Sequence, residues 1–297
     1  MCKITKKVSK EYTKIYNFEN GYAFVANNTT LGVIDENLEE IISPIHNAIM
    51  HFKDDMFFTI DSFNHHLLTL RILKSSNVLI TTLPYLSIFK LYNNSPYYIV
   101  KQNDLYGLID MDLKQVVPVK YYYINYLFED FIKIVISEGS TRYYGIFCLS
   151  KGQIIDPKYK SINSIGNCLF GVENFDKKLA LFDTNGKQLT DFIYDQLCLT
   201  GCYVSCFIKD HNRPYECLIG LLDNTGKQLI NPVYDGIYSK GHGYVVSKGT
   251  KCGICDSKAN LVSDVIFDRV YNINEYNKTC RRFAEVRYKG IDGTFVW

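Results

Sequence analysis

Two cysteines three positions apart, Cys252 and Cys255, form the motif that most directly suggests chemistry. A Cys-X-X-Cys pair can supply half of a zinc site or the reactive end of a thiol redox centre. On a strand, however, positions three apart point to opposite faces, and the sequence offers no second pair with suitable spacing. We therefore expect both thiols to pack inside the fold and to hold no metal.

Aspartates recur at one position of a repeated phrase, which raises the possibility of calcium binding: Asp35, Asp110, Asp183, Asp223 and Asp256. The run from Asp183 to Gly186 is similar to the start of a calcium loop, but the distal bidentate glutamate is missing. An aspartate that opens a turn can instead accept hydrogen bonds from the turn's own backbone amides. The pattern favours turn capping.

The other candidate groups also fit structural roles. Cys198, Cys202 and Cys206 recur every four residues, and on one strand they would share a face as small buried hydrophobes. The histidines His65, His66 and His211 lie in polar, loop-like stretches with no matching nucleophile and orienting acid. We therefore assign no catalytic, cofactor-binding or metal-binding residue.

An aromatic segment from Tyr121 to Tyr126 is denser than core packing requires. Strand alternation places Tyr122 on the face opposite Tyr121 and Tyr123. Exposed tyrosines are common anchors at protein interfaces, so Tyr122 and Tyr126 are the expected partner-binding residues, with extra core filling as the alternative. Single-stranded nucleic acid could also stack there, but no basic groove accompanies the rings, and we expect no nucleic-acid partner.

The elements that position these residues form a repeat. A phrase aromatic–apolar–Gly–apolar–apolar–Asp returns seven times in whole or in part, and separations of its glycine position are 39, 36, 38, 35, 40 and 33 residues. The anchors are Gly32, Arg71, Gly107, Gly145, Ala180, Gly220 and Gly253. A period of about 37 residues indicates a repeat architecture.

Two further positions confirm the register of the repeat. Fourteen residues after each anchor stands a ring: His46, Tyr85, Tyr121, Tyr159, Tyr194, Tyr234 and Phe267. Seventeen residues after each anchor stands an aliphatic side chain: Ile49, Ile88, Ile124, Ile162, Leu197, Ile237 and Val270. Five copies also carry a proline eleven to thirteen residues after the anchor: Pro44, Pro84, Pro118, Pro157 and Pro232.

The copy around Gly145 predicts three short strands joined by turns. They cover residues 131–136, 143–149 and 153–155, and Pro157 ends the unit with a bend because proline cannot donate to a sheet. Glycine is costly inside a strand, so its recurrence predicts that a neighbouring ring or backbone lies against it. One meander cannot bury both faces, so adjacent repeats must stack.

This arrangement resembles the WG-repeat (KWG-repeat) family of bacterial proteins, whose repeat reads Trp-Gly-Leu-Ile-Asp, a Gly-Lys turn, Ile-Pro and an aromatic-Asp pair. The matching positions of one copy are Gly220 to Asp223, Gly226-Lys227, Ile230 to Pro232, Tyr234-Asp235 and Ile237. The family's tryptophan is absent from every copy here. The resemblance covers residues 17 to 297 and implies an all-β repeat protein without catalytic residues.

We therefore expect an all-β fold of seven tandem three-stranded antiparallel meanders, each about 37 residues long. An open, curved or superhelical array is favoured because three strands fall one short of a propeller blade; a closed seven-bladed β-propeller is the alternative. Residues 1–16 form an N-terminal cap and residues 17–297 a single array, with Lys289 to Trp297 as a partial eighth unit.

Composition narrows the class of function. The 297 residues carry 33 basic and 31 acidic side chains, a net charge of +2, and 47% apolar residues, with no hydrophobic stretch suited to a signal peptide or membrane span. We expect a cytoplasmic protein with reduced thiols and no cofactor or membrane partner. Its expected function is a non-enzymatic protein-interaction scaffold, specifically an immunity protein that neutralises a toxin. The alternative is a hydrolase with a site at an atypical repeat or axial channel, and the oligomeric state stays open.

Overall fold

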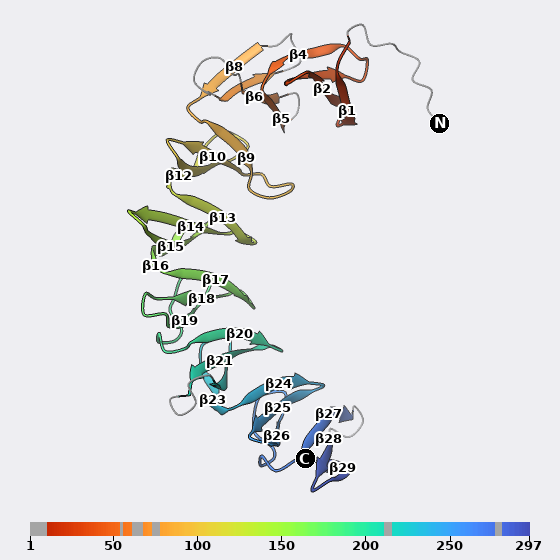
Figure 1. The fold of residues 1–297 in the computed structure, drawn as a ribbon, viewed down its shortest axis with the longest axis vertical. Coiled ribbons are helices and arrows are strands. Elements are labelled where there is room, and N and C mark those ends of the chain that lie inside the picture. Colours follow the sequence, from red (N-terminus) through yellow and green to blue (C-terminus); the bar gives the residue numbers. More distant parts are fainter. Residues whose placement is uncertain (1–10, 54–55, 61–67, 73–77, 211–215, 277–280) are drawn as a thin grey trace, which may run out of the picture. The chain divides into compact units, whose positions relative to one another are not determined.

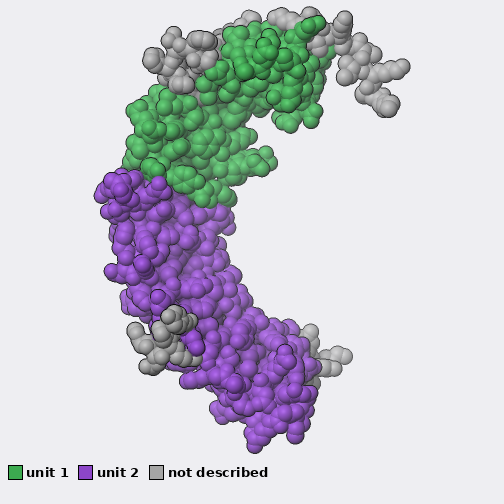
Figure 2. Space-filling view, in the orientation of Figure 1, with its two compact units in different colours: residues 1–126 green, residues 127–297 purple. Residues whose placement is uncertain are grey.

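The computed structural model describes residues 11–53, 56–60, 68–72, 78–210, 216–276 and 281–297. The chain divides into two compact units, residues 1–126 and 127–297 (Figure 2). The described residues form 29 strands in eight small antiparallel sheets and contain no helix (Figure 1). The all-β repeat fold is therefore confirmed. Residues 1–10 of the expected N-terminal cap lie outside the described residues.

Unit 1 contains three four-stranded sheets, numbered here in chain order. Sheet 1 consists of β1 (Lys14–Glu19), β2 (Tyr22–Asn27), β3 (Thr30–Asp35) and β4 (Glu40–His46). Sheet 2 consists of β5 (Ala48–Lys53), β6 (Met56–Ile60), β7 (Leu68–Ile72) and β8 (Val78–Leu83). Sheet 3 consists of β9 (Ser87–Lys90), β10 (Tyr98–Gln102), β11 (Leu105–Ile109) and β12 (Gln115–Tyr121).

Five more sheets follow, and the unit boundary falls inside their first strand. Sheet 4 consists of β13 (Tyr123–Phe128), β14 (Phe131–Glu138), β15 (Thr141–Cys148) and β16 (Gly152–Tyr159). Sheet 5 consists of β17 (Ser161–Gly166), β18 (Leu169–Glu173) and β19 (Leu179–Phe182).

Sheet 6 consists of β20 (Gln196–Thr200), β21 (Tyr203–Lys209), β22 (Cys217–Leu222) and β23 (Gln228–Tyr234). Sheet 7 consists of β24 (Gly236–Lys240), β25 (Gly243–Lys248) and β26 (Lys251–Cys255). Sheet 8 consists of β27 (Arg269–Tyr276), β28 (Arg281–Tyr288) and β29 (Ile291–Val296).

The structure adds a first strand to the expected three-stranded meander. In sheet 6, β21, β22 and β23 form the meander, while β20 pairs with the outer edge of β21. This first strand begins just after the bend and carries the aliphatic residue seventeen positions after the previous anchor, here Leu197. The bend therefore ends one sheet and starts the next, because the chain returns to an extended form immediately after the ring of Tyr194.

The anchor glycine lies under the backbone of the fourth strand, as its recurrence predicts. A Cβ on Gly220 would stand 2.5 Å from Ile230 O and 2.8 Å from Pro232 N. The register between β22 and β23 shifts at this point, from the pair Ile219–Tyr234 to the pair Leu221–Ile230. The bulged strand bends toward the third strand, and only a residue without a Cβ leaves room for it.

Proline accompanies the complete fourth strand. The five four-stranded sheets each have a proline within or directly after that strand: Pro44, Pro84, Pro118, Pro157 and Pro232. Sheets 5 and 7 have Phe192 and Val265 at the matching position, and there the fourth strand is reduced to isolated bridges. Proline has no N–H to pair, which suits the bulge over the glycine.

Consecutive sheets are held together by shared apolar cores. In unit 2 the core between sheets 6 and 7 joins Leu221 and Ile230 to Ile237, Tyr244 and Val246. Similar cores join sheets 4 and 5, 5 and 6, and 7 and 8. Sheets 5 to 8 follow one another in chain order in Figure 1. Each core draws side chains from two neighbouring sheets, as expected of stacked repeats.

Sheet 8 is more complete than the partial unit expected at Lys289 to Trp297. Three full strands are present, and Val286 of β28 pairs with Gly293 of β29. This pairing repeats that of Cys206 with Gly220 in sheet 6, so Gly293 is an eighth anchor glycine. The sequence spacing supports this assignment, since Gly293 follows Gly253 by 40 residues.

Candidate interaction surface

Tyr122 and Tyr126, the expected partner-binding residues, occupy different surroundings. Tyr122 lies in the bend between β12 and β13 and is 41% exposed, whereas the preceding Tyr121 is buried. Tyr123, expected to share the buried face of Tyr121, is instead 51% exposed, because the bend at Tyr122 interrupts strand alternation. Tyr126 is half-buried and packs on Tyr92, with ring centroids 4.4 Å apart.

Tyr126 borders a small hollow of unit 1, with a volume of about 220 Å³. This Tyr126 hollow is lined by Phe89, Lys90, Leu91, Ile99, Tyr106, Tyr123, Ile124, Asn125 and Tyr126. Lys101 extends over Tyr106, 5.8 Å from the ring centroid, and forms a 2.7 Å ion pair with Asp104. The structure thus brings Tyr126 together with other aromatic side chains, but does not place Tyr122 in the same hollow.

A larger hollow of unit 1, about 620 Å³ in volume, lies against the first strands of sheets 1 to 3. This unit 1 hollow is lined by Tyr16, Asn17, Glu19, Asn20, Tyr22, Ala23, Phe24, Val33, Ile49, Met50, His51, Phe57, Lys90 and Asn94. Its lining is mixed: aromatic and aliphatic side chains lie beside the polar residues Asn17, Glu19, Asn20, His51, Lys90 and Asn94. A hollow of this volume is within the size range of ligand sites. Lys90 borders both hollows, so the two form neighbouring parts of one surface.

Phe57 is a buried residue in the lining of the unit 1 hollow. Its side chain is 1% exposed, and the rings of Tyr22 and His51 meet it edge-on at centroid distances of 5.5 and 5.0 Å. Such T-shaped pairs add favourable energy beyond the burial of their area. The floor is therefore rigidly packed, whereas Tyr16 at the rim is 41% exposed and has the Lys14 ammonium 4.3 Å from its ring centroid.

The sequence did not predict the unit 1 hollow because its lining comes from three sheets. One signal was available: β1 carries Ile15, Tyr16 and Phe18 without polar alternation, and all its residues are exposed. Apolar residues on both faces of a strand are usual where both faces are covered, whereas Ile15, Tyr16 and Phe18 are 41–44% exposed. Contiguous exposed apolar residues are frequent at interaction surfaces.

The recurring aspartates cap turns, as expected. Oδ1 of Asp223 accepts hydrogen bonds from the backbone amides of Thr225 at 2.8 Å and Lys227 at 3.0 Å. Asp35, Asp110, Asp183 and Asp256 accept the same two bonds, from the second and fourth following residues. Burial raises the pKa of Asp223, but the bonds from Thr225 and Lys227 outweigh it and lower the pKa below its usual value.

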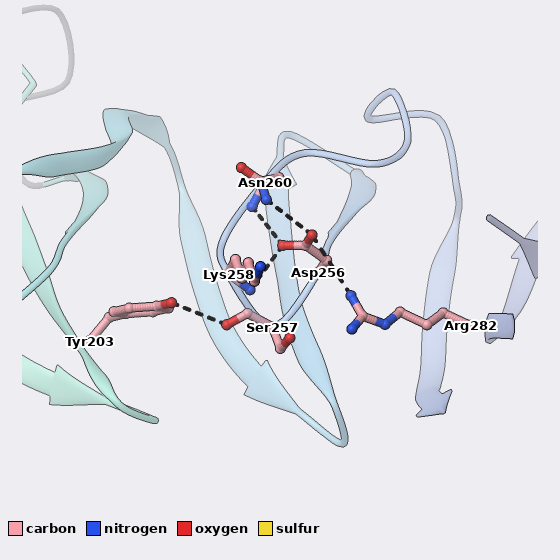
Figure 3. A network of polar contacts seen from close by, with 6 residues as sticks. All are labelled: Tyr203, Asp256, Ser257, Lys258, Asn260 and Arg282. Carbon is pink, nitrogen blue, oxygen red and sulfur yellow. Dashed lines mark hydrogen bonds and ion pairs between the residues drawn. The ribbon is translucent and has the colours of Figure 1, made fainter. Parts of the chain in front are cut away.

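Asp256 extends this turn into a polar network between sheets (Figure 3). Its carboxylate also accepts a 3.0 Å bond from the Asn260 side-chain amide and lies 3.9 Å from Nη1 of Arg282 in sheet 8. The hydroxyl of Tyr203 in sheet 6 donates to the carbonyl oxygen of Ser257 at 3.2 Å. The turn of sheet 7 is therefore tied to both neighbouring sheets. The described residues contain no cluster of three metal-ligating side chains.

Cys252 and Cys255 point to opposite faces of β26, as the spacing predicts. Cys255 packs in the core between sheets 6 and 7, and Cys252 packs against the core between sheets 7 and 8. Burial, followed by the nearby Asp256 charge, raises the pKa of Cys255 to about 12. The eight cysteines in the described part of the chain are free thiols.

The expectation for the other three cysteines was wrong in part. Cys198, Cys202 and Cys206 do not share a strand, because Gly201 adopts φ +62 and the chain turns between β20 and β21. Only Cys206 is buried; Cys202 is exposed, with its sulfur 3.3 Å from the Tyr244 hydroxyl. Residues His65, His66 and His211 lie outside the described residues.

The sequence model of the WG containing repeat matches residues 6–28 and 219–246. These matches support the resemblance to the WG-repeat family in those two segments, and the described residues form a β-repeat fold. An interaction scaffold fits this class of protein. No curated protein matches the sequence. In the part of the chain that the structure describes, no helix could span a bilayer.

Among solved structures, the chain is similar to a protein described as a eukaryotic initiation factor, with 9% identity, a TM-score of 0.37, and coverage of 98% of this chain and 86% of that one. Kluyveromyces lactis Hsv2p gives 9% identity and a TM-score of 0.30, covering 92% of this chain and 97% of that one. BamB from Moraxella catarrhalis gives 11% identity and a TM-score of 0.27, covering 96% and 95%. We draw no functional conclusion from similarities this distant.

Proposed function

We propose that this chain is a non-enzymatic protein-interaction scaffold of the bacterial cytoplasm, and that it acts as an immunity protein that binds and neutralises a protein toxin. The observation that carries the proposal is the unit 1 hollow, whose packed aromatic floor is bordered by the exposed ring of Tyr16. Aromatic side chains held in place by packing are the residues that most often anchor a protein partner.

The character of the lining favours binding over catalysis. The described residues that line the unit 1 hollow include no serine, threonine or cysteine that could act as a nucleophile. Burial raises the pKa of the Cys206 thiol to about 11, which keeps it protonated at neutral pH and unreactive. A hydrolase that forms a covalent intermediate on serine, threonine or cysteine would need such a nucleophile beside a base.

The test begins with affinity capture. The tagged full-length chain is incubated with lysate of its own cells, beside variants Tyr16→Ala and Tyr126→Ala that shorten rings lining the two hollows. Phe175→Ala serves as the control, because Phe175 is an exposed ring of unit 2 (50%, against 41% for Tyr16) that lines neither hollow. We expect one stoichiometric protein partner, retained by the native chain and Phe175→Ala and weakened at least tenfold by each tyrosine variant.

The second step separates an immunity protein from other scaffolds. The captured partner is expressed alone and together with the chain, and growth is measured. Growth inhibition by the partner alone, relieved by the native chain and not by Tyr16→Ala, supports the proposal. Absence of any stoichiometric partner contradicts the scaffold function, and a harmless partner contradicts the immunity function.

A further inference from the structure

Gly293 differs from the other anchor glycines in what lies above it. In sheets 1, 3, 4 and 6 a Cβ on the anchor would stand within 3 Å of the fourth strand's backbone. A Cβ on Gly293 would meet nothing within 4 Å. Among the described residues, β29 pairs only with β28. Sheet 8 therefore has an anchor glycine and a free strand edge, where sheets 1 to 4 and 6 carry a fourth strand and sheets 5 and 7 carry isolated bridges.

A hollow accompanies this free edge. The sheet 8 hollow, about 460 Å³ in volume, has a mainly apolar lining that includes Phe267, Gly293 and Phe295, with Lys289, Asp292 and Thr294 also bordering it. Ile291 and Val296 of β29 are 74% and 57% exposed. In sheet 6 the corresponding place is filled by the fourth strand, whose Ile230 and Tyr234 pack into the core toward sheet 7.

Trp297 gives an independent sign that a hydrogen-bonding group is missing beside sheet 8. Its indole Nε1 is shielded from solvent and has no acceptor among the described residues. A buried tryptophan N–H nearly always has a hydrogen-bond partner. The ring stacks on Phe295, with centroids 5.7 Å apart, so it belongs to the same part of sheet 8 as the hollow.

Sheet 1 shows the complementary feature, a ring of the kind that ends a fourth strand. Ile15 of β1 pairs with Val25, just as Ile237 of sheet 7 pairs with Val246. Tyr12 precedes Ile15 by three residues, as Tyr234, the last residue of a fourth strand, precedes Ile237. Tyr12 packs on a cluster of sheet 1 formed by Ala23, Val25 and Ile34. Sheet 1 thus receives the ring that ends a fourth strand.

The residues before Tyr12 have the sequence of such a strand. Counted back from the ring, Lys6 to Tyr12 aligns with Gln228 to Tyr234, and Val8 takes the place of the core residue Ile230. The match to the WG containing repeat begins at residue 6. Lys10 replaces the proline, as Phe192 and Val265 do in sheets whose fourth-strand segment still forms bridges.

We propose that residues 6–12 of a second copy of this chain add to β29 as its fourth strand, so that copies associate head to tail. The register of sheet 6 places Val8 opposite Thr294 and Tyr12 opposite Asp292. Val8 then fills the sheet 8 hollow, and the backbone of the added strand crosses Gly293. This self-association is independent of the toxin partner proposed above.

A second copy is the occupant because the two surfaces are complementary and distinct. The donor segment, residues 6–12, belongs to the beginning of the array, and the acceptor edge, the free edge of β29, belongs to sheet 8. A copy that is bound through one of them still presents the other. Such a heterologous contact continues from copy to copy. In unit 2 the shared cores join consecutive sheets, which leaves the outer side of sheet 8 for another molecule.

Disulfide cross-linking tests the pairing. Cys2, Cys168 and Cys202 are changed to serine, and Val8→Cys and Thr294→Cys are placed on separate chains that are mixed and oxidised. Directly opposite residues of antiparallel strands lie about 4.5–5.5 Å apart at Cα, within the range of a disulfide. We expect a dimer across the two variants, and at least tenfold less of it when Lys7→Cys, on the opposite strand face, replaces Val8→Cys.

Two outcomes of the cross-linking would overturn the proposal. The first is a mixture that yields no cross-linked dimer. The second is a disulfide that forms only when both cysteines are on one chain and leaves it monomeric, since this would place the segment in its own chain. The mixture of the two single-cysteine variants and the variant with both cysteines on one chain are each prepared as the full chain and examined on a non-reducing gel.

Gly293→Val provides the matched change on the acceptor side. Its Cβ meets nothing in the free chain, so folding is retained, but the added strand can no longer cross. In sedimentation velocity, we expect the native protein to grow in size with concentration and Gly293→Val to remain monomeric. Val8→Asp, which would put a charge into the sheet 8 hollow, should also remain monomeric. A native chain that stays monomeric, or a Gly293→Val chain that still associates, would refute the proposal.

Discussion

Gly220 lies directly beneath the peptide that leads into Pro232, and a Cβ at Gly220 would stand 2.8 Å from the proline nitrogen. This approach ties the two most recognisable positions of the repeat to one feature, the bulge of the fourth strand. Glycine is needed below the bulge and proline is favoured in it. The motif therefore encodes a strand crossing and leaves the surface of each repeat free to vary.

Gly220→Ala should destabilise unit 2 by about 3 kcal/mol, the upper end of the cost of overpacking. Gly253→Ala provides the comparison: its Cβ would lie 3.1 Å from the Val265 methyl, which can move. We expect about 1 kcal/mol for that variant. Urea unfolding followed by circular dichroism measures both, and equal losses would contradict the role of the bulge.

Tyr98→Phe should destabilise unit 1 by about 1–2 kcal/mol. The Tyr98 ring is fully buried, and its hydroxyl donates a 3.1 Å hydrogen bond to the carbonyl oxygen of Phe52 in the neighbouring sheet. The substitution removes this hydrogen bond from the core. Tyr238→Phe is the control, because Tyr238 is 54% exposed and its loss should be within about 0.5 kcal/mol.

Stability should decrease as the pH falls below about 4, the ordinary aspartate pKa. The turn hydrogen bonds keep the pKa values of Asp223 and Asp256 lowered in the folded state, despite burial, which acts in the opposite direction. A lowered folded pKa contributes stability that is present above the unfolded pKa and lost as the pH falls through the folded one.

The free energy of unfolding at pH 7, 4 and 3 checks this prediction. Asp223→Asn should show a smaller decrease between pH 4 and 3 than the native chain, because one of the titrating carboxylates is gone. An unchanged pH dependence in this variant would contradict the assignment of acid sensitivity to the turn aspartates.

Thiol alkylation should distinguish buried from exposed cysteines. Burial raises the pKa values of Cys206 to about 11 and of Cys255 to about 12, so neither thiol is ionised at pH 8. Iodoacetamide followed by mass spectrometry should label the exposed Cys168 in the folded protein and reach the other two only after unfolding. Rapid labelling of Cys255 in the folded protein would contradict its place in the core.

Much of the repeat could be read from residue spacing because it rests on local rules. Glycine at a strand crossing, aspartate at a turn and a ring fourteen residues later recur at fixed positions, so the period and the meander follow from sequence alone. The same reasoning placed Tyr122 on the surface. It failed for Tyr123 and Cys202, because a single bend or turn residue ends strand alternation, and its exact position depends on tertiary packing.

The sequence by itself determined the all-β class, the repeat period, the turn chemistry and the structural role of the anchor glycines. Only the tertiary structure decided which strands pair across a repeat boundary. The sequence pattern ended each unit at the bend, but β20, which follows the bend, is the first strand of the next sheet. It alone brought Tyr16, His51 and Phe57 around one hollow and left Gly293 uncovered. Spacing along the chain governs local geometry, whereas the surroundings of a residue depend on neighbouring repeats far from it in sequence.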